Sequence, residues 1–177
     1  MFHITNYASP IGEILLASDE HSIVGLWIEN QKHFAATVLE DAMEKSDSAI
    51  LRAGTEWLDE YFAGEKPEIS RLPLAPSGSE FRQTVWALLI EIPYGETTTY
   101  GTIAARTAER LGRPSMSARA VGGAIGHNPI SIIIPCHRVV GANGKLTGYA
   151  GGIDIKIKLL EHEKRKSHPS NKAYNKR

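Results

Sequence analysis

Residues 132–140 read IIIPCHRVV, and this run contains the only cysteine of the 177-residue chain, Cys136. A lone cysteine cannot form an internal disulfide or a cysteine-rich zinc site, so it is either a small buried hydrophobe or a reactive thiol. An apolar, strand-like segment leads into it, and His137 and Arg138 follow directly. Because a nearby cation favours the nucleophilic thiolate, the neighbours favour a reactive thiol.

The adjacent Cys136 and His137 do not by themselves establish catalysis. Neighbouring side chains of an extended segment point to opposite faces, so a bridging water or a turn would be needed to connect them. A nucleophile also needs a base, and the base needs an orienting group, which Glu161 or Glu163 near the end of the chain could supply. The alternative is a core cysteine beside a surface histidine. The other histidines show no metal-ligand spacing, so we expect no metal.

Upstream of this run, the first part of the chain has the pattern of a small α/β unit. Apolar-rich runs separated by turn-like residues predict three strands, and helical spacing of apolar residues predicts one helix that stops at Gly64. The strands are expected at 2–7, 13–17 and 23–28, and the helix at 47–62. The proline-rich stretch 66–78 has the composition of a linker, so we place a domain boundary near residue 78.

The second half, 79–165, changes character and is predicted to be mainly helical. Ser79 is the expected N-cap of one helix, a threonine of 97–99 caps a second, and Ser115 or Ser117 opens a third over 118–125. Two short helices and a third rich in small residues suggest a helix-turn-helix. A last helix is expected at 154–163, and the basic tail 166–177 is expected to be disordered.

Charge separates the two halves, although the net charge of the chain is zero. Residues 1–78 hold five Lys and Arg against thirteen Asp and Glu, whereas residues 79–165 hold eleven against seven and the tail holds four against none. This asymmetry suggests that the C-terminal half faces a polyanion, although an acidic helix surface and a frayed basic tail would also explain it. No apolar run could span a membrane and no signal peptide is visible, which together with one cysteine predicts a cytoplasmic protein.

Three features of the second half could serve a nucleic acid. Gly122 and Gly123 lie inside the third helix, where each glycine costs about 1 kcal/mol relative to alanine, so they need a reason. Close packing within the protein and close docking into a groove, with Arg119 projecting, explain them equally well. Tyr100, at a helix start, is either half-buried between helices or near a backbone phosphate. The glycine-rich stretch 141–152 lacks a phosphate-loop pattern and is expected to form a pocket wall.

Taken together, these motifs resemble the methylated-DNA–protein-cysteine methyltransferases, or O6-alkylguanine-DNA alkyltransferases. The similar segments are IPCHRV at 134–139, RAVGGA at 119–124 and Asn128-Pro129, followed by GYAGG at 148–152 and LLEHE at 159–163. The resemblance is strong over 79–165 and holds only in outline in the N-terminal half. It implies a small N-terminal α/β domain, with an antiparallel sheet and a helix, and a mainly helical, winged-helix-like DNA-binding domain with a helix-turn-helix.

The resemblance also implies a role for particular residues. Cys136 would accept the alkyl group, His137 would deprotonate it through a water, Glu163 would orient His137, and Asn128 would hold the turn before the active-site segment. Tyr100 would contact the phosphate of the target nucleotide and Arg119 would fill the hole left by its extrusion, with Gly122 and Gly123 on the same DNA-binding helix. The substrate pocket would include Pro135, Val139, Tyr149 and Ala150.

The expected activity is single-use transfer of the alkyl group from O6-methylguanine, and from O4-methylthymine, in double-stranded DNA to Cys136. No cofactor is expected, and the protein is expected to act as a monomer. Two alternatives are a non-catalytic lesion sensor, against which Cys136 argues, and an unrelated cysteine hydrolase, which would leave Arg119 and the glycine pair unexplained. The sequence departs from the family pattern in a longer segment at 106–116 and in Ser131, where some relatives carry proline.

Overall fold

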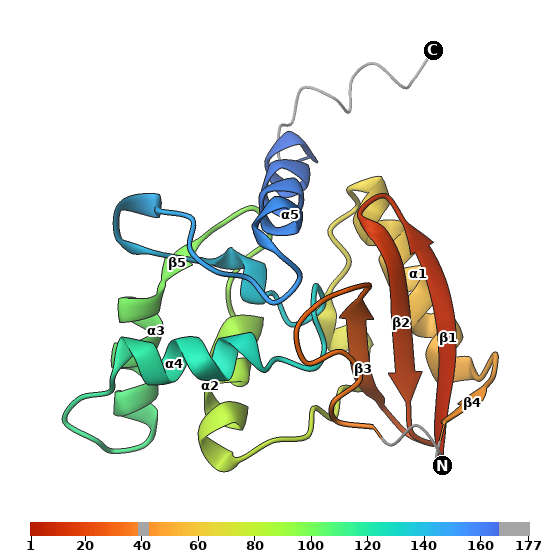
Figure 1. Ribbon diagram of the computed structural model, residues 1–177, viewed down its shortest axis with the longest axis horizontal. Coiled ribbons are helices and arrows are strands. Elements are labelled where there is room, and N and C mark those ends of the chain that lie inside the picture. The colour runs from red at the N-terminus through yellow and green to blue at the C-terminus, as the bar shows by residue number, and fades with distance from the viewer. Residues whose placement is uncertain (39–42, 167–177) are drawn as a thin grey trace.

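The computed structural model describes residues 1–38 and 43–166, and pairs a small sheet with a helical half that lies beside it (Figure 1). Residues 39–42 and 167–177 are outside the description, and with them nearly all of the basic tail that was expected to be disordered. The predicted combination of an N-terminal α/β part and a mainly helical C-terminal part is confirmed.

The N-terminal sheet has the strand order β3-β2-β1-β4. The bounds are β1 Phe2–Ser9, β2 Gly12–Ser18, β3 Ile23–Ile28 and β4 Met43–Lys45. β1, β2 and β3 pair antiparallel, as predicted, and the short β4 pairs parallel with β1, which the sequence did not indicate. Alternate residues of a strand face opposite sides, so Leu26 enters the main core while Trp27 packs in a second cluster on the other face.

Helix α1, Ala49–Ala63, contributes the other layer of this half. The Ser48 hydroxyl accepts a hydrogen bond from the backbone N–H of Leu51, and the helix ends at Gly64, whose φ of 80° suits a residue without Cβ. Its buried face carries Trp57 and Tyr61 toward the centre of the molecule. The apolar spacing seen in the sequence therefore matches the buried face of α1.

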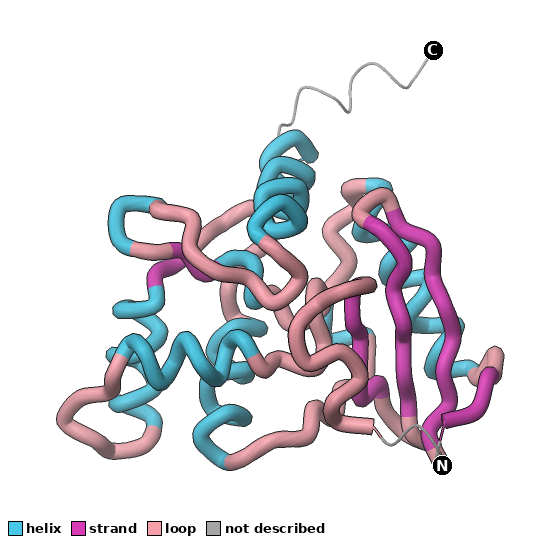
Figure 2. Tube along the Cα trace, in the orientation of Figure 1, coloured by secondary structure: helices cyan, strands magenta, loops and turns pink. Residues whose placement is uncertain are grey.

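The C-terminal half begins with three helices, and each N-terminus carries a side-chain cap, as the sequence suggested. The helices are α2 Glu80–Ile90, α3 Tyr100–Arg110, α4 Ala118–Gly126 and, later, α5 Ile153–Lys166 (Figure 2). The caps of the first three are Ser79, Thr99 and Ser117. A two-stranded parallel sheet joins β5, Thr98–Thr99, to β6, Val139–Val140. It connects the start of α3 to the segment that follows Cys136.

One continuous hydrophobic core runs through both halves. At the junction the backbone N–H of Leu26 in β3 donates to the carbonyl of Pro129 (2.8 Å), and the N–H of Ser131 donates to the carbonyl of Leu26 (3.0 Å). The chain that leads from α4 to Cys136 is thus hydrogen-bonded to the edge of the N-terminal sheet. The sheet fixes the position of the segment that carries the candidate nucleophile.

The expectation of a strand-like run before Cys136 is wrong. Residues 131–134 form a turn in which Ile132 has a φ of 71°, a left-handed conformation that is unusual for a β-branched residue. The Asn128 side chain holds the turn closed, because its Nδ2 donates to the carbonyl of Ile134 (2.8 Å) and its Oδ1 accepts from the N–H of Ile130 (3.0 Å). A 3-10 turn, Cys136–Arg138, follows directly.

Candidate active site

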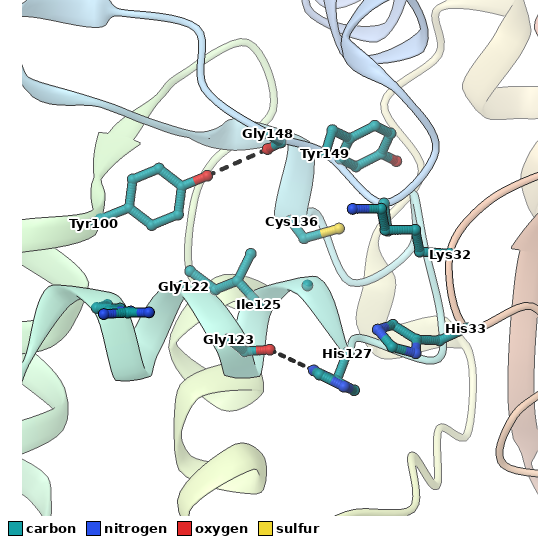
Figure 3. Close-up of a pocket in the computed structure, with 13 residues that line it drawn as sticks. Lys32, His33, Tyr100, Gly122, Gly123, Ile125, His127, Cys136, Gly148 and Tyr149 are labelled. Carbon is teal, nitrogen blue, oxygen red and sulfur yellow. Dashed lines mark hydrogen bonds between the residues drawn. The ribbon is translucent and has the colours of Figure 1, made fainter.

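A cavity of about 450 Å³ opens between the two halves of the molecule and has Cys136 in its lining. Helix α4, the start of α3, the glycine-rich stretch and a loop after β3 all contribute to its walls. Figure 3 shows the Cys136 sulfur pointing into the cavity, with Tyr100 on one side and Lys32 and His33 on the other. The glycine-rich stretch contributes Gly148, Tyr149 and Ala150, in line with its expected place in a pocket wall.

The Cys136 thiol is almost completely buried, with 3% of the residue exposed. Burial raises the pKa of Cys136, while the polar groups of Asn128 and Tyr149 and the charge of Lys156 act in the opposite direction. The resting side chain is therefore a protonated thiol. A base must remove its proton when an electrophile is in position.

His137 is placed to be that base. The residue is fully buried, and its Nε2 lies 2.7 Å from Oε1 of Glu163. A carboxylate only accepts hydrogen bonds, so Nε2 carries the proton and Nδ1 holds the lone pair. Nδ1 is buried and has no hydrogen-bond partner among the described residues, and no direct hydrogen bond joins His137 to Cys136 there. Burial lowers the pKa of His137, which keeps the imidazole neutral and able to accept a proton.

Glu163 is the centre of a buried network that the sequence only partly indicated. Besides His137, its carboxylate accepts hydrogen bonds from the guanidinium of Arg138, with contacts of 2.9–3.2 Å, from the Tyr61 hydroxyl (2.9 Å) and from the backbone N–H of Gly95 (3.3 Å). Burial alone would raise the pKa of Glu163, but His137 and Arg138 hold it well below its usual range. The carboxylate is ionised, and Arg138 balances its charge.

Lys156 in α5 is a second buried cation beside the site. Its Nζ donates to the carbonyls of Val139 (2.6 Å) and Thr147 (3.1 Å), and it lies 5.8 Å from the centre of the Tyr100 ring. Burial lowers the pKa of Lys156, and its charge lowers that of Cys136. Lys156 thereby ties β6 to the glycine-rich wall and favours the thiolate.

The outer rim of the cavity is formed by α4, with Arg119, Gly122 and Gly123 in its lining. A Cβ added at Gly123 would meet no atom within 4 Å, and one at Gly122 would make only ordinary contacts of 3.8–3.9 Å with the Tyr100 ring. Packing within the protein therefore does not require these glycines, which removes one of the two explanations. The Tyr100 hydroxyl points across the cavity to the carbonyl of Gly148 at 3.5 Å (Figure 3).

The residues expected to form the substrate pocket separate into two pairs. Tyr149 and Ala150 line the cavity, and the hydroxyl of Tyr149 is buried. Pro135 and Val139 are buried outside the cavity lining, where Val139 pairs with Thr98 in the small sheet. Pro135 and Val139 thus pack in the protein interior next to Cys136 and do not line the cavity.

The N-terminal half supplies part of the cavity wall, which sequence reasoning missed. Lys32 and His33 line the cavity, the backbone N–H of Lys32 donates to the carbonyl of Ala150 (2.9 Å), and the rings of His33 and His127 stack with centroids 4.0 Å apart. The side chain of Gln31 fixes this loop, because its Oε1 accepts from the N–H of Ile28 (2.7 Å). No periodicity in the sequence pairs this loop with His127 or Ala150, which lie far along the chain.

Lys156 and Tyr61 were also missed, and Arg138 was expected to act on the thiol, whereas it pairs with Glu163. Arg138 stands in an apolar run, and a buried cation needs a counter-charge. Lys156 lies seven residues before Glu163 in α5, so both fall on the same helix face, which the buried Leu159 also occupies. A buried phenol such as that of Tyr61 usually finds a partner, but no pattern in the sequence identifies Glu163 as that partner.

Within residues 1–38 and 43–166, no group of three or more His, Cys, Asp or Glu side chains could hold a metal ion. In the same ranges, no helix is long and apolar enough to cross a membrane.

Two models of one family match most of the chain. The family model described as "6-O-methylguanine DNA methyltransferase, DNA binding domain" matches residues 80–165, and the one described as the "ribonuclease-like domain" of the same protein matches residues 2–76. A methylated-DNA–protein-cysteine methyltransferase of Methanosarcina acetivorans is 48% identical over 157 residues, covering 89% of this chain and 95% of that protein. One from Mycobacterium tuberculosis is 44% identical over 170 residues, with 93% of each covered.

Solved structures give the same result. The crystal structure of Mycobacterium tuberculosis OGT in complex with DNA has a TM-score of 0.80 and 43% identity, and the match covers 93% of this chain and 94% of that one. The M. tuberculosis O6-methylguanine methyltransferase has a TM-score of 0.79 and 40% identity, with 99% and 100% covered. Both family models and these relatives show that the chain belongs to the methylated-DNA–protein-cysteine methyltransferase family.

Proposed function

We propose that the chain repairs double-stranded DNA by moving the alkyl group of O6-methylguanine, and of O4-methylthymine, to Cys136, and that each molecule reacts once. The observation that carries this proposal is the buried Cys136 in a cavity beside His137, whose unpaired Nδ1 is free to accept a proton while Glu163 holds Nε2. The M. tuberculosis relative in complex with DNA supports the class of partner.

In the proposed reaction, His137 accepts the thiol proton through a water as the sulfur attacks the alkyl carbon. The S–C bond forms while the C–O6 bond breaks, and the electron pair of that bond goes to the guanine. A proton then goes to the guanine, with the Tyr100 hydroxyl as the candidate donor. Glu163 stabilises the imidazolium that forms on His137, because its carboxylate is held ionised. The thioether has no route back to a thiol, so the site is consumed.

We place the DNA on the face formed by α3 and α4, which we interpret as a helix-turn-helix. In such motifs the second helix enters the major or minor groove with its first residues near the bases, and Arg119 is the second residue of α4. The open positions at Gly122 and Gly123 let a DNA backbone approach the helix closely. We assign close docking, rather than internal packing, as the reason for the glycine pair.

The alkyl carbon of a lesion lies inside the base stack, so the target nucleotide must be flipped out to reach Cys136. Flipping costs a few kcal/mol, and an inserted side chain offsets part of that cost. We assign this insertion to Arg119 and the contact with the target phosphate to Tyr100. Tyr149 and Ala150 would line the pocket for the flipped guanine, and Asn128 would fix the turn beneath it.

The division of the chain near residue 78, the monomeric state and the cytoplasmic location remain predictions. A lesion sensor on the same scaffold is the alternative function, and it needs no thiol. The presence of Cys136 with its base favours transfer over sensing.

Intact-mass spectrometry after mixing the protein with O6-methylguanine duplex tests the proposal. We expect one adduct of +14 Da per molecule, mapped to Cys136, and none in Cys136→Ala. Turnover beyond one methyl per protein, or transfer that survives Cys136→Ala, would contradict it. Tight binding to the lesion without any gain in mass would favour the sensor.

A further inference from the structure

The contact between the two halves includes one hydrogen bond that reaches the candidate catalytic residues. Tyr61, in α1 of the N-terminal half, is fully buried, and its hydroxyl donates to Oε1 of Glu163 at 2.9 Å across 102 positions of sequence. Burial and the charge of Glu163 raise the pKa of Tyr61 well above its usual value, so the phenol remains a donor.

The oxygen that Tyr61 binds is the same oxygen that binds the base. Oε1 of Glu163 accepts from Tyr61 and, at 2.7 Å, from Nε2 of His137, and Arg138 also contacts it at 2.9 Å. Donors that share one carboxylate oxygen divide its negative charge, and each fixes the direction of the others. A change at Tyr61 therefore acts on the atom that orients and polarises His137.

The ring of Tyr61 is held so that its hydroxyl cannot turn elsewhere. It stacks on Trp57 with centroids 5.6 Å apart and makes edge contacts with Phe62 at 5.1 Å and Tyr94 at 5.8 Å. Its backbone carbonyl accepts a hydrogen bond from Nε2 of His162 in α5 at 2.8 Å. Tyr94 and His162 thus fix both the ring and the main chain of Tyr61 against the C-terminal half.

We propose that Tyr61 is a positioning residue for the Glu163–His137 pair, through which the N-terminal half tunes the base that activates Cys136. This inference rests on the proposed transfer to Cys136. The hydroxyl of Tyr61 draws charge from Oε1 and keeps the carboxylate aimed at Nε2 of His137. Without it, Oε1 would hold the imidazole proton more strongly, and the carboxylate would have one anchor fewer.

Several other groups face this pair, so the test must separate them. They are Tyr94, Tyr149, Arg138 and Lys156, with His162 against Tyr61. Tyr94 provides the matched control, because its ring belongs to the same cluster and its buried hydroxyl has no hydrogen-bond partner among the described residues. Tyr94→Phe removes the same atom as Tyr61→Phe without removing a hydrogen bond to Glu163.

The experiment measures the single-turnover rate of methyl transfer from an O6-methylguanine duplex between pH 5 and 9 for the wild type, Tyr61→Phe and Tyr94→Phe. For Tyr61→Phe we expect the acid limb, which follows His137, to move up by about half a pH unit and the plateau to fall by about tenfold. Tyr94→Phe should change neither. The inference would be overturned if Tyr61→Phe had the pH profile of the wild type, or if its rate fell equally at every pH without a shift of the acid limb. If the wild type itself transferred no methyl group, the result would count against the proposed function instead.

A second variant covers the case in which Tyr61→Phe does not fold. Replacing Tyr61 alone by 3-fluorotyrosine keeps the ring and makes the phenol a stronger donor. We expect its acid limb to move in the opposite direction, to lower pH. An unshifted limb in a folded fluorinated protein would also overturn the inference.

Discussion

The two halves of the molecule share a core but divide the work unequally. The C-terminal half holds Cys136, His137 and Glu163, together with the glycine pair of α4. The N-terminal half consists of a sheet and one helix around an apolar interior. Yet the N-terminal half reaches the site at two places, with Lys32 and His33 in the cavity wall and Tyr61 on Glu163. The N-terminal half therefore contributes part of the cavity wall and one hydrogen bond to Glu163, although it holds none of the reacting groups.

The basic side chains of the N-terminal half also separate into those that stay within that half and those at its border with the other half. Residues 1–78 contain only five Lys and Arg. Arg52 and Arg71 pair with carboxylates of their own half, and Lys66 lies over the Tyr94 ring. Lys32 has no ion pair with any described carboxylate and faces the cavity. The polar residues of this half that matter for the site are those at its border with the other half.

The sharpest test of this division removes the carboxylate at the centre of the network. Glu163→Gln leaves the Arg138 guanidinium buried without its counter-charge, which costs about 3–5 kcal/mol when one partner of such a pair is removed. It also deprives His137 of the group that stabilises its protonated form, so we expect transfer to slow by at least about a hundredfold. Urea unfolding and single-turnover rates measure the two effects.

The matched control for this prediction lies on the same helix. Glu161 is exposed in α5 and makes only a 3.9 Å contact with Arg165. Glu161→Gln should change stability and rate very little. If Glu161→Gln and Glu163→Gln lost stability and transfer rate equally, α5 would be sensitive to any lost charge and the buried network would not explain the effect of Glu163→Gln.

A second prediction concerns acid and the two buried groups of the C-terminal half that form the catalytic pair. The pKa values of both His137 and Glu163 are lower in the folded protein than in the unfolded chain. Their contributions to stability are therefore present at high pH and are lost as pH falls, below about 6.5 for His137 and below about 4.3 for Glu163. Urea unfolding at a series of pH values should show this fall, and His137→Gln should flatten its upper part. His21→Gln, at an exposed turn of the N-terminal sheet, is the matched histidine replacement outside the buried network.

The sequence predicted the elements of both halves better than the contacts between them. Caps and apolar spacing located α1 to α4 because these signals are local, and the helix stop at Gly64 was equally clear. Cys136 and His137 were singled out from the residues themselves, with Glu161 or Glu163 as the orienting group, and the resemblance selected Glu163. The structure brings His137 and Glu163 within hydrogen-bonding distance. These long-range partners could not be derived from spacing.

The errors have the same origin. Apolar residues before Cys136 looked like a strand, but the Asn128 side chain closes that segment into a turn with Ile132 in a left-handed conformation. The bond from Tyr61 to Glu163 and the position of Lys32 depend on how the halves pack. A periodic pattern reports which face of an element is buried, and it does not report what covers that face.

Two glycines, one in each half, give a third comparison. A Cβ at Gly54 in α1 would lie 2.6 Å from Leu16, whereas a Cβ at Gly123 in α4 would meet no atom within 4 Å. Gly54→Ala should therefore destabilise the protein by about 1–3 kcal/mol through overpacking, with DNA affinity unchanged in the folded fraction. Gly123→Ala should stabilise it by up to about 1 kcal/mol through helix propensity and yet weaken DNA binding.

Thermal unfolding and fluorescence anisotropy with a labelled duplex measure these two properties separately. The informative outcome is a Gly123→Ala protein that is more stable than the wild type but binds DNA more weakly. A glycine kept for internal packing would instead lose stability when replaced by a larger residue. If Gly123→Ala bound DNA as tightly as the wild type, docking would not be the reason for the glycine pair.

The smallest expected effect tests whether the wall from the N-terminal half meets the DNA. Lys32 is exposed, points into the cavity and has no carboxylate partner among the described residues, so its charge is available to a phosphate. Lys32→Met should slow transfer from duplex DNA by about threefold at low salt and reduce the salt dependence of binding by about one charge. Reaction with the free O6-alkylguanine base should stay unchanged, because the charge acts on the DNA backbone and not on the thiol. Lys158→Met removes an exposed charge outside the cavity lining, and an equal effect there would mean that any lost cation matters, wherever it lies.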